Sequence, residues 1–273
     1  MNAANGVTLT AAATAFDRVA DSYDELFTQT AIGRAQRKQV WKELLAAFPQ
    51  GSRILELNCG TGEDARFLAK EGRSVVACDA SAAMIAVARR HRDEASELST
   101  IQYLQTANED LDALCFEQPF DGAFSNFSGL NCLADFRSFA CNLAKLVKPG
   151  SRVLLCLWSR VCVAEVMWYL LHAEPKKAGR RFSSKATARL GELTISVNYP
   201  TVREMRYSFS PWFQLVSRRA VGLFIPPSYT ERAIARHNKP LACLEWLDSL
   251  CAGWPILRDA GDHVLLEFVR CNP

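Results

Sequence analysis

Residues 54–79 most constrain the fold of this chain. They contain a short apolar run, a turn with Gly60 and Gly62, a stretch with apolar residues at helical spacing that stops at Gly72, and a second apolar run. This pattern predicts a strand, a turn, a helix and a strand. In a right-handed crossover both strands end at the same edge of a parallel sheet. We therefore expect the Gly60 turn and Asp79, where the second run ends, to form a crevice for a nucleoside.

The charges around the turn distinguish two kinds of nucleoside. The spacing Gly-x-Gly-x-x-Ala that starts at Gly60 also fits the fingerprint of dinucleotide-binding domains. However, Glu56 precedes the turn and Glu63 and Asp64 follow it, and carboxylates repel a pyrophosphate. S-adenosylmethionine has a cationic sulfonium and amino group, which acids attract, while helix N–H groups can bind its carboxylate. Asp79 lies about 20 residues after the start of the turn, where it can accept both ribose hydroxyls.

The composition is that of an ordinary globular protein. With 273 residues, 49% of them hydrophobic, the chain can form one core with an appended lobe. Its net charge of +3 is too small to indicate a nucleic-acid partner. No apolar run is long enough to cross a bilayer and no signal peptide is evident, so we expect a cytoplasmic protein without a membrane partner. The ten cysteines are scattered, which favours reduced, buried thiols and no metal site.

The segment Glu56-Leu57-Asn58-Cys59-Gly60-Thr61-Gly62, followed by Asp79, resembles the first two motifs of class I S-adenosylmethionine-dependent methyltransferases. The resemblance is strongest to small-molecule enzymes of the ubiquinone and menaquinone biosynthesis type and to sugar N-methyltransferases, and it spans roughly residues 16–158. Asn58 stands where the family most often has glycine, but asparagine tolerates the left-handed conformation. The resemblance implies a Rossmann-like α/β fold with a seven-stranded, mostly parallel sheet, an antiparallel last strand and helices on both faces. It also implies S-adenosyl-L-methionine as cofactor and S-adenosyl-L-homocysteine as product.

The resemblance further implies roles for residues beyond the turn. In this family N-terminal helices cover the cofactor, and Tyr23 resembles a tyrosine near the methyl group; simple packing of the lid is the alternative. Ala80 and Met84, which follow the second strand, occupy positions that flank the adenine in this family. Asn108 or Glu109 replaces the acid that holds the adenine amino group, because Ala107 occupies the usual position of that acid. Residues 125–128 follow the fourth strand, where we expect the transferred methyl. The predicted cofactor-binding residues are Glu56, Asn58, Gly60, Gly62, Asp79, Ala80, Met84, Asn108, Glu109, Asn126 and Phe127.

The remaining pattern predicts three parts of the chain. Residues 1–48 form a tail that is frayed to residue 15, followed by lid helices over residues 16–27 and 32–48. Residues 49–160 form the cofactor-binding core. Residues 161–273 complete the sheet and carry an α+β substrate lobe. The further elements expected are strands at 100–106, 119–124, 152–158, 211–223 and 262–270, helices at 136–147 and 161–172, a helix that is capped by Ser81 and has an apolar stripe over residues 84–88, a hairpin at 188–199, and two additions, at 174–210 and at the helical stretch 228–251.

The expected chemistry is methyl transfer to a small-molecule oxygen, nitrogen or carbon nucleophile by in-line displacement, with catalysis mainly from positioning. Nucleic-acid amino-methyltransferases have an Asp/Asn-Pro-Pro-aromatic element after the fourth strand; its absence here argues against a nucleobase acceptor. Two other readings stay open, a nicotinamide-dependent oxidoreductase and a non-catalytic nucleoside-binding sensor. We expect the two additions and the Tyr23 helix to form the acceptor pocket. Candidate catalytic residues are Tyr23, His172 and His237, the histidines having a surface position as the alternative, and candidate substrate residues are Tyr23, Trp158, Tyr207, Trp212 and Trp246.

Overall fold

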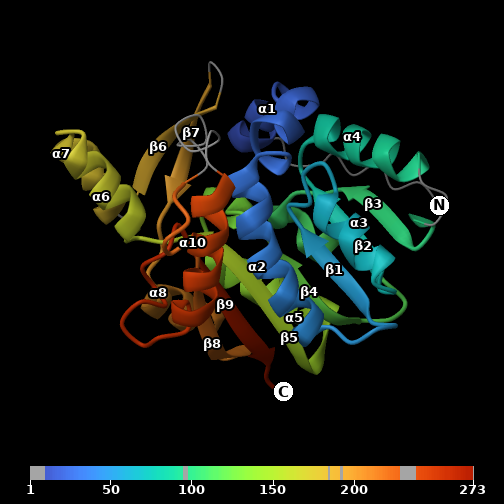
Figure 1. The fold of residues 1–273 in the computed structure, drawn as a ribbon. Helices are drawn as coiled ribbons and strands as arrows, with labels where there is room; N and C mark the ends of the chain where they lie inside the picture. The colour runs from blue at the N-terminus through green and yellow to red at the C-terminus, as the bar shows by residue number, and fades with distance from the viewer. Residues whose placement is uncertain (1–9, 95–97, 184, 191–192, 228–237, 273) are drawn as a thin grey trace.

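A seven-stranded sheet forms the centre of the computed structural model, which describes residues 10–94, 98–183, 185–190, 193–227 and 238–272 (Figure 1). The strand order is β3-β2-β1-β4-β5-β9-β8, and β9 runs antiparallel to both of its neighbours, which confirms the expected sheet. Leu57 pairs with Cys78 on one side and with Ser125 on the other, so three strands end at one edge. The strands are β1 Arg53–Leu57, β2 Ser74–Asp79, β3 Ile101–Gln105, β4 Phe120–Ser125, β5 Val147–Trp158, β8 Phe213–Val221 and β9 His263–Arg270.

Helices cover both faces of the sheet, because consecutive strand residues point to opposite sides. Ile54 packs in a cluster with apolar residues of α2, α3 and α4, whereas Leu55 packs in a second cluster with residues of α5 and α8. Both faces are therefore apolar, as expected for a mostly parallel sheet. The helices on these faces are α2 Ala31–Ala47, α3 Glu63–Lys70, α4 Ala82–Asp93, α5 Phe136–Leu146 and α8 Val202–Phe209, and short helices follow β3 and β4 at η4 Asn108–Ala113 and η5 Gly129–Cys132.

The N-terminal region is more ordered than the sequence predicted. Helix α1, Ala11–Asp17, starts at Thr10, whose side chain accepts a hydrogen bond from the backbone N–H of Ala13. For residues 10–15 the expectation of a frayed tail is therefore wrong, because small residues without periodicity still pack: Ala15 is fully buried. Residues 1–9, the rest of that expected tail, lie outside the described residues. The single helix expected over residues 16–27 is instead broken into the end of α1 and two short helices, η1 Ala20–Ser22 and η2 Asp24–Thr28.

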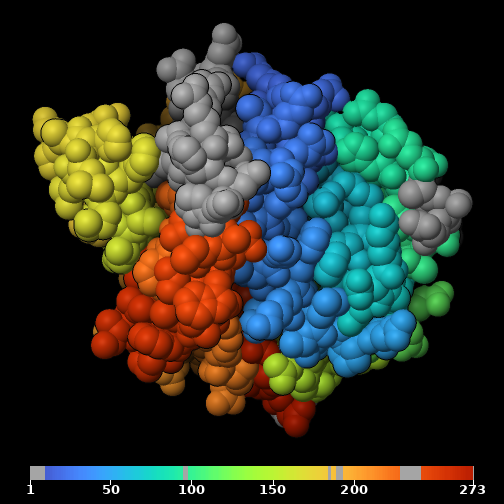
Figure 2. Space-filling view, in the orientation of Figure 1, coloured from blue at the N-terminus to red at the C-terminus, as the bar shows by residue number. Residues whose placement is uncertain are grey.

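The additions to the sheet fold lie in different places. Strand β7 of the hairpin contacts α1 and η5, helix α10 packs against α2, and α6 and α7 project from the body of the protein (Figures 1 and 2). Residues 228–237 of the second expected addition lie outside the described residues. These elements are α6 Val163–Leu171, α7 Pro175–Ala178, η6 Arg180–Phe182, β6 Lys185–Leu190, β7 Leu193–Asn198 and α10 Asn238–Cys251.

Helix α8 corrects the expectation that residues 174–210 form one addition. Met205 and Phe209 are buried in the cluster on the α5 face of the sheet, so this helix is part of the core. The apolar residues of α8 occur at i and i+4, which is the spacing of one helical face. Tyr207 lies on the opposite face and is 76% exposed.

The packing of α8 predicts that two alanine substitutions on this helix lower the free energy of unfolding by very different amounts. Phe209 is fully buried against the rings of Phe139, Phe213 and Phe268. Phe209→Ala is expected to lower the free energy of unfolding by about 3 to 5 kcal/mol, because it leaves a cavity. Tyr207→Ala is expected to change it by less than about 0.5 kcal/mol. Urea unfolding of both variants measures this, and a loss below about 1 kcal/mol for Phe209→Ala would contradict the core position of α8.

Candidate functional site

The turn between β1 and α3 has the backbone that its glycines suggest. Gly60 and Gly62 have φ of 55° and 77°, values that favour glycine. Asn58 has φ of 57°, so the asparagine adopts the left-handed conformation that was expected of it. Its side-chain oxygen accepts hydrogen bonds from Ser125 Oγ at 3.1 Å and Asn108 Nδ2 at 3.3 Å. Asn58 therefore joins the turn to the segments that follow β3 and β4.

Asp79 lies at the end of β2 and holds the turn in place. Its Oδ2 accepts a hydrogen bond from the backbone N–H of Gly60 at 2.9 Å, and its Oδ1 accepts one from the N–H of Ser81 at 2.9 Å. Burial raises the pKa of the Asp79 carboxyl, and these two N–H groups counter part of that effect. A carboxylate has about four acceptor positions, so the group can still accept two hydroxyls.

One cavity of about 210 Å³ lies over the turn and the ends of β2 and β4. It brings together ten of the residues predicted from the sequence, although their roles in binding stay predictions. The cavity lies between the N-terminal helices and the sheet edge, which is the crevice expected for this topology. The ten residues are Tyr23, Asn58, Gly60, Asp79, Ala80, Met84, Asn108, Glu109, Asn126 and Phe127.

Arg37 also lines this cavity and was missed by the sequence analysis. Its Nη1 lies 2.6 Å from Asp64 Oδ2, and both side chains are buried. Asp64 also accepts hydrogen bonds from Trp41 Nε1 at 2.6 Å and Asn126 Nδ2 at 3.0 Å. Asp64 lines the cavity too, but its charge is paired with Arg37, so it is less available to attract the cationic end of a ligand than the sequence analysis assumed. The one sequence feature that could have pointed to Arg37 is its position among the apolar residues of α2, because a buried arginine needs an acidic partner.

Aromatic rings form one side of the cavity. The ring of Tyr23 lies between those of Phe16 and Phe27, at centroid distances of 6.3 and 6.0 Å, and Phe27 lies 5.0 Å from Phe127. Burial raises the pKa of Tyr23 to about 12, so its phenol is neutral near pH 7 and is a poor general base. Asp24, the next residue, accepts a hydrogen bond from Thr61 Oγ1 at 2.6 Å, which attaches η2 to the glycine turn.

The cover of the cavity combines β7, which lies in the addition expected at 174–210, with the start of α1 and the η5 segment, which the sequence did not assign to it. Residues of α1 and of the η5 segment line it, together with Ile195 and Ser196 of β7. Ala15 of α1 packs against Ile195 in a separate small cluster, so α1 and β7 cover the cavity as a unit. The alanines of α1 and the serine of β7 that line the cavity form no motif that would identify them as binding residues in the sequence. The additional lining residues are Thr10, Ala11, Ala12, Ala13, Cys132 and Leu133.

Three predicted residues close to the cavity do not line it. Glu56 is buried beneath the turn, burial raises the pKa of its carboxyl well above the usual range, and its Oε2 has no hydrogen-bond partner within the described residues. Gly62 caps α3 and packs on Tyr103. Trp158 stacks on Tyr199, with 6.0 Å between the ring centroids.

Other candidates lie elsewhere. Tyr207 is exposed on α8, and Trp212 packs against the core under the guanidinium of Arg137. His172 is exposed at the end of α6, where its ring stacks on Trp168, and Trp246 is exposed on α10. None of these four lines the cavity, because α6, α8 and α10 are attached to other parts of the sheet fold. His237 lies outside the described residues.

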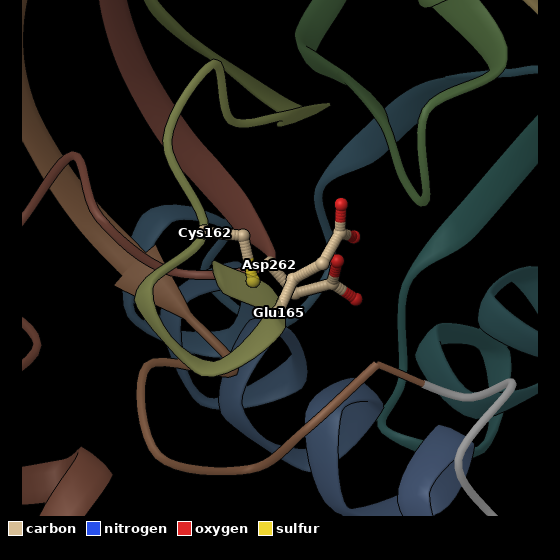
Figure 3. A group of neighbouring side chains, drawn as sticks. All are labelled: Cys162, Glu165 and Asp262. Carbon is tan, nitrogen blue, oxygen red and sulfur yellow. The ribbon is translucent and has the colours of Figure 1, made fainter. Parts of the chain in front are cut away.

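A buried cluster outside the cavity has the composition of a metal site. Atoms of Cys162, Glu165 and Asp262 that could bind an ion lie within 4.8 Å of one another (Figure 3). However, Arg181 Nη2 lies 2.6 Å from Glu165 Oε2 and 2.7 Å from Asp262 Oδ1. Burial raises the pKa of Cys162 to about 12, so its thiol stays protonated. A guanidinium therefore supplies the positive charge here, and the cluster attaches α6 and η6 to the core.

Comparison with known proteins identifies the family. A model described as a methyltransferase domain matches residues 54–150. A 2-phytyl-1,4-naphtoquinone methyltransferase of Thermosynechococcus vestitus is 30% identical over 166 residues, which cover 57% of this chain and 69% of the relative. The chain belongs to the class I S-adenosylmethionine-dependent methyltransferases.

Other relatives of this methyltransferase act on different acceptors. A demethylmenaquinone methyltransferase of Clavibacter sepedonicus is 32% identical over 53% of this chain and 56% of its own. A tRNA 5-carboxymethoxyuridine methyltransferase of Escherichia coli K12 is 28% identical over 62% of this chain and 67% of its own. The chain thus spans only 56% to 69% of the lengths of the curated quinone methyltransferases that it matches.

Solved structures agree with the fold. The CcbJ methyltransferase from Streptomyces caelestis has a TM-score of 0.62 at 14% identity, covering 95% of this chain and 98% of that one. A DhpI–SAH complex has a TM-score of 0.56 at 17% identity, covering 96% of this chain and 97% of that one. Within the described residues no helix of this methyltransferase is both long and apolar enough to cross a bilayer, and none of the ten cysteines is in a disulfide.

The glycine turn of the methyltransferase gives a test with a matched control. An alanine Cβ at Gly62 would lie 2.3 Å from the hydroxyl oxygen of buried Tyr103, whereas one at Gly150, with φ of 80°, would meet nothing. Gly150→Ala is expected to cost about 1 to 2 kcal/mol of stability from backbone strain alone. Gly62→Ala is expected to cost about 1 to 3 kcal/mol more, because the ring has to move. Equal losses in urea unfolding would contradict the tight packing of the turn.

Proposed function

We propose that this methyltransferase transfers a methyl group from S-adenosyl-L-methionine to a small-molecule acceptor by in-line displacement. One observation carries the proposal: the Asp79 carboxylate, the Gly60 turn and the Arg37 guanidinium line the same cavity. A nucleoside with an amino-acid extension has a group for each of them, namely ribose hydroxyls, a sulfonium centre and a carboxylate. The cofactor supplies a methyl group that is activated by the positive charge on sulfur.

The nucleoside end of the ligand fits the segments after β2 and β3. Asp79 would accept the ribose hydroxyls, while Ala80 and Met84 would flank the adenine. Asn108 donates its Nδ2 hydrogen bond to Asn58, which leaves its side-chain oxygen available to accept from the adenine amino group. Glu109 is exposed at the edge of the same cavity and is the alternative acceptor.

The amino-acid end of the ligand fits Arg37. A guanidinium binds a carboxylate through two parallel hydrogen bonds, and burial strengthens such a pair. Asp64, Trp41 and Asn126 keep this guanidinium and its partner in place, so Asp64 acts as a positioning residue. Glu63, which lines the cavity, and Glu56, with a buried oxygen below the turn that has no partner among the described residues, would be the acids left for the ligand's amino group.

The protein contributes to the reaction mainly by orienting the reactants and excluding water. Tyr23 lies over Gly60, since a Cβ at that position would be 4.0 Å from Tyr23 Cε1. Tyr23, Asn126 and Phe127 would therefore surround the transferred methyl. Holding the nucleophile in line is worth up to about 7 to 11 kcal/mol in favourable cases. The apolar cover formed by α1 and β7 would exclude water during the transfer.

An apolar small molecule is the acceptor that this cavity supports best. Phe16, Leu133 and Ile195 give the covered part of the cavity an apolar wall, and two relatives are named for quinone substrates. Transfer of a labelled methyl group to reduced 1,4-naphthoquinone, with tRNA as the comparison, tests this choice. Labelling of tRNA alone would overturn the small-molecule assignment, and turnover on neither while S-adenosylhomocysteine binds would favour a sensor.

Ligand-dependent stability separates this function from a nicotinamide-dependent oxidoreductase. S-adenosylhomocysteine at about 100 times its dissociation constant is expected to stabilise the fold by ~2.7 kcal/mol. NAD is expected to give no stabilisation, because the carboxylates around the turn, such as Glu63 in the cavity lining, repel a pyrophosphate. Thermal unfolding with each ligand measures the difference, and stabilisation by NAD alone would exclude the proposed function.

Arg37 is expected to bind only the amino-acid part of the ligand. The double variant Arg37→Met/Asp64→Asn removes the guanidinium without leaving a buried unpaired charge. Relative to Asp64→Asn, it is expected to weaken S-adenosylhomocysteine binding about tenfold to a hundredfold, since a charge-assisted hydrogen bond contributes about 1.5 to 3 kcal/mol. Binding of 5′-methylthioadenosine, which has no carboxylate, is expected to stay the same. Calorimetry measures both, and an equal loss for the two ligands would contradict this role.

Asp79 is expected to bind the part that both ligands share. Asp79→Ala removes a charged acceptor of two hydroxyls, so it is expected to weaken S-adenosylhomocysteine and 5′-methylthioadenosine by similar factors, each at least about tenfold. Circular dichroism checks that the variant is folded. Affinities within about threefold of the wild type would exclude Asp79 from ribose binding.

A further inference from the structure

Helix α6 has the reverse of the usual arrangement of a surface helix. Its one charged residue, Glu165, is buried, whereas Met167 and Leu170 are each 52% exposed and Leu171 is 78% exposed. A surface helix normally turns its apolar side chains toward the core and its charges toward water. Figures 1 and 2 show α6 and α7 projecting from the body of the protein, which is consistent with the exposure of these apolar side chains.

Ion pairs rather than apolar packing fix this orientation. Glu165 accepts hydrogen bonds from Arg180 Nε at 2.8 Å and Arg181 Nη2 at 2.6 Å, and Arg181 also binds Asp262. Although burial raises the pKa of the Glu165 carboxyl, these arginines hold it below its usual value. The buried carboxylate therefore stays charged and anchored, and the apolar side of α6 stays on the surface.

The surface next to these side chains is basic and aromatic. Residues 160–182 contain five basic and two acidic residues. Of these, Arg181 and Glu165 are buried and paired with each other, and Lys177 is paired with Glu174, so the exposed part of this segment is still net basic. Lys176 and Lys177 are exposed on α7, directly after α6. Tyr169 lies beneath Lys177 and Arg180, whose charged groups are 5.7 and 5.6 Å from its ring centroid. Aliphatic, aromatic and basic side chains together are typical of a segment that lies at a lipid interface.

We propose that the α6–α7 surface, formed by Val163, Met167, Leu170, Leu171, Lys176 and Lys177, docks on an anionic lipid bilayer. Nine residues give α6 a length of about 13 Å, so it can lie within the interface but cannot cross a hydrocarbon core of about 30 Å. The expectation of no membrane partner rested on the lack of a spanning segment and of a signal peptide, and neither bears on docking at the surface of a bilayer. A lipid surface complements the lysines, whereas a two-fold dimer through the same surface would bring the lysines of both copies together.

Sedimentation with vesicles tests this inference without any methyl donor, so its outcome is independent of the proposed function. The full chain is mixed with vesicles of phosphatidylcholine alone or of phosphatidylcholine with phosphatidylglycerol. The variant Leu170→Glu/Leu171→Glu adds two charges to the α6–α7 surface. The control Tyr207→Glu/Val216→Glu adds two charges at exposed positions of α8 and β8. Circular dichroism melting checks that both variants are folded, and size-exclusion chromatography with light scattering gives the oligomeric state.

The wild type and the control are expected to bind the anionic vesicles, with affinity that falls as salt rises. The wild type is expected to bind the neutral vesicles about tenfold more weakly, and Leu170→Glu/Leu171→Glu to bind the anionic ones about tenfold more weakly than the control. Absence of wild-type binding to both compositions would overturn the proposal, as would an equal loss in the two variants. A dimer that only Leu170→Glu/Leu171→Glu dissociates, without vesicle binding, would assign the surface to a second copy.

Discussion

The site depends on the buried ion pair between Asp64 and Arg37. The Asp64 carboxylate joins α2, through Arg37 and Trp41, to the first turn of α3 and to Asn126 after β4. Three segments that are distant in the sequence therefore meet at one group. Removing one partner from a buried ion pair leaves a charge without compensation, which typically costs 3 to 5 kcal/mol. The same pair holds a guanidinium at the cavity, so the interaction that stabilises the N-terminal helices also prepares a site for an anionic group.

The parts that the sequence predicted well are local. The run from Arg53 to Asp79 specifies its own strand, turn, helix and strand, because the apolar period and the glycines act within a few residues of each other. The topology then follows from the handedness of crossovers, which brings Asp79 to Gly60. Ten cavity residues could be predicted because the resemblance to the family assigned them roles, and most of them follow strands that end at one sheet edge.

The parts that were missed depend on contacts between distant segments. Arg37 resembles any arginine of a surface helix until Asp64 is placed beside it, and α1 is stabilised by its packing against β7 rather than by its own composition. Helix α8 was assigned to the lobe because its apolar pattern does not say which face of the sheet it covers. The inverted burial of α6 is equally invisible in the sequence, since Glu165 turns inward only because Arg180 and Arg181 meet it there. Whether a charged side chain is buried depends on the oppositely charged group that it meets in the fold, and a local sequence pattern does not identify that group.

These contacts give the cavity a direction: Asp79 at one end, Arg37 at the other, and Tyr23 over the turn between them. A crystal structure of the chain with S-adenosylhomocysteine tests that direction most directly. The account predicts the ribose hydroxyls on the Asp79 carboxylate, the sulfur between Gly60 and Tyr23, and the ligand carboxylate on the Arg37 guanidinium. A ligand in the reverse orientation, or one bound outside the cavity under α1 and β7, would contradict it.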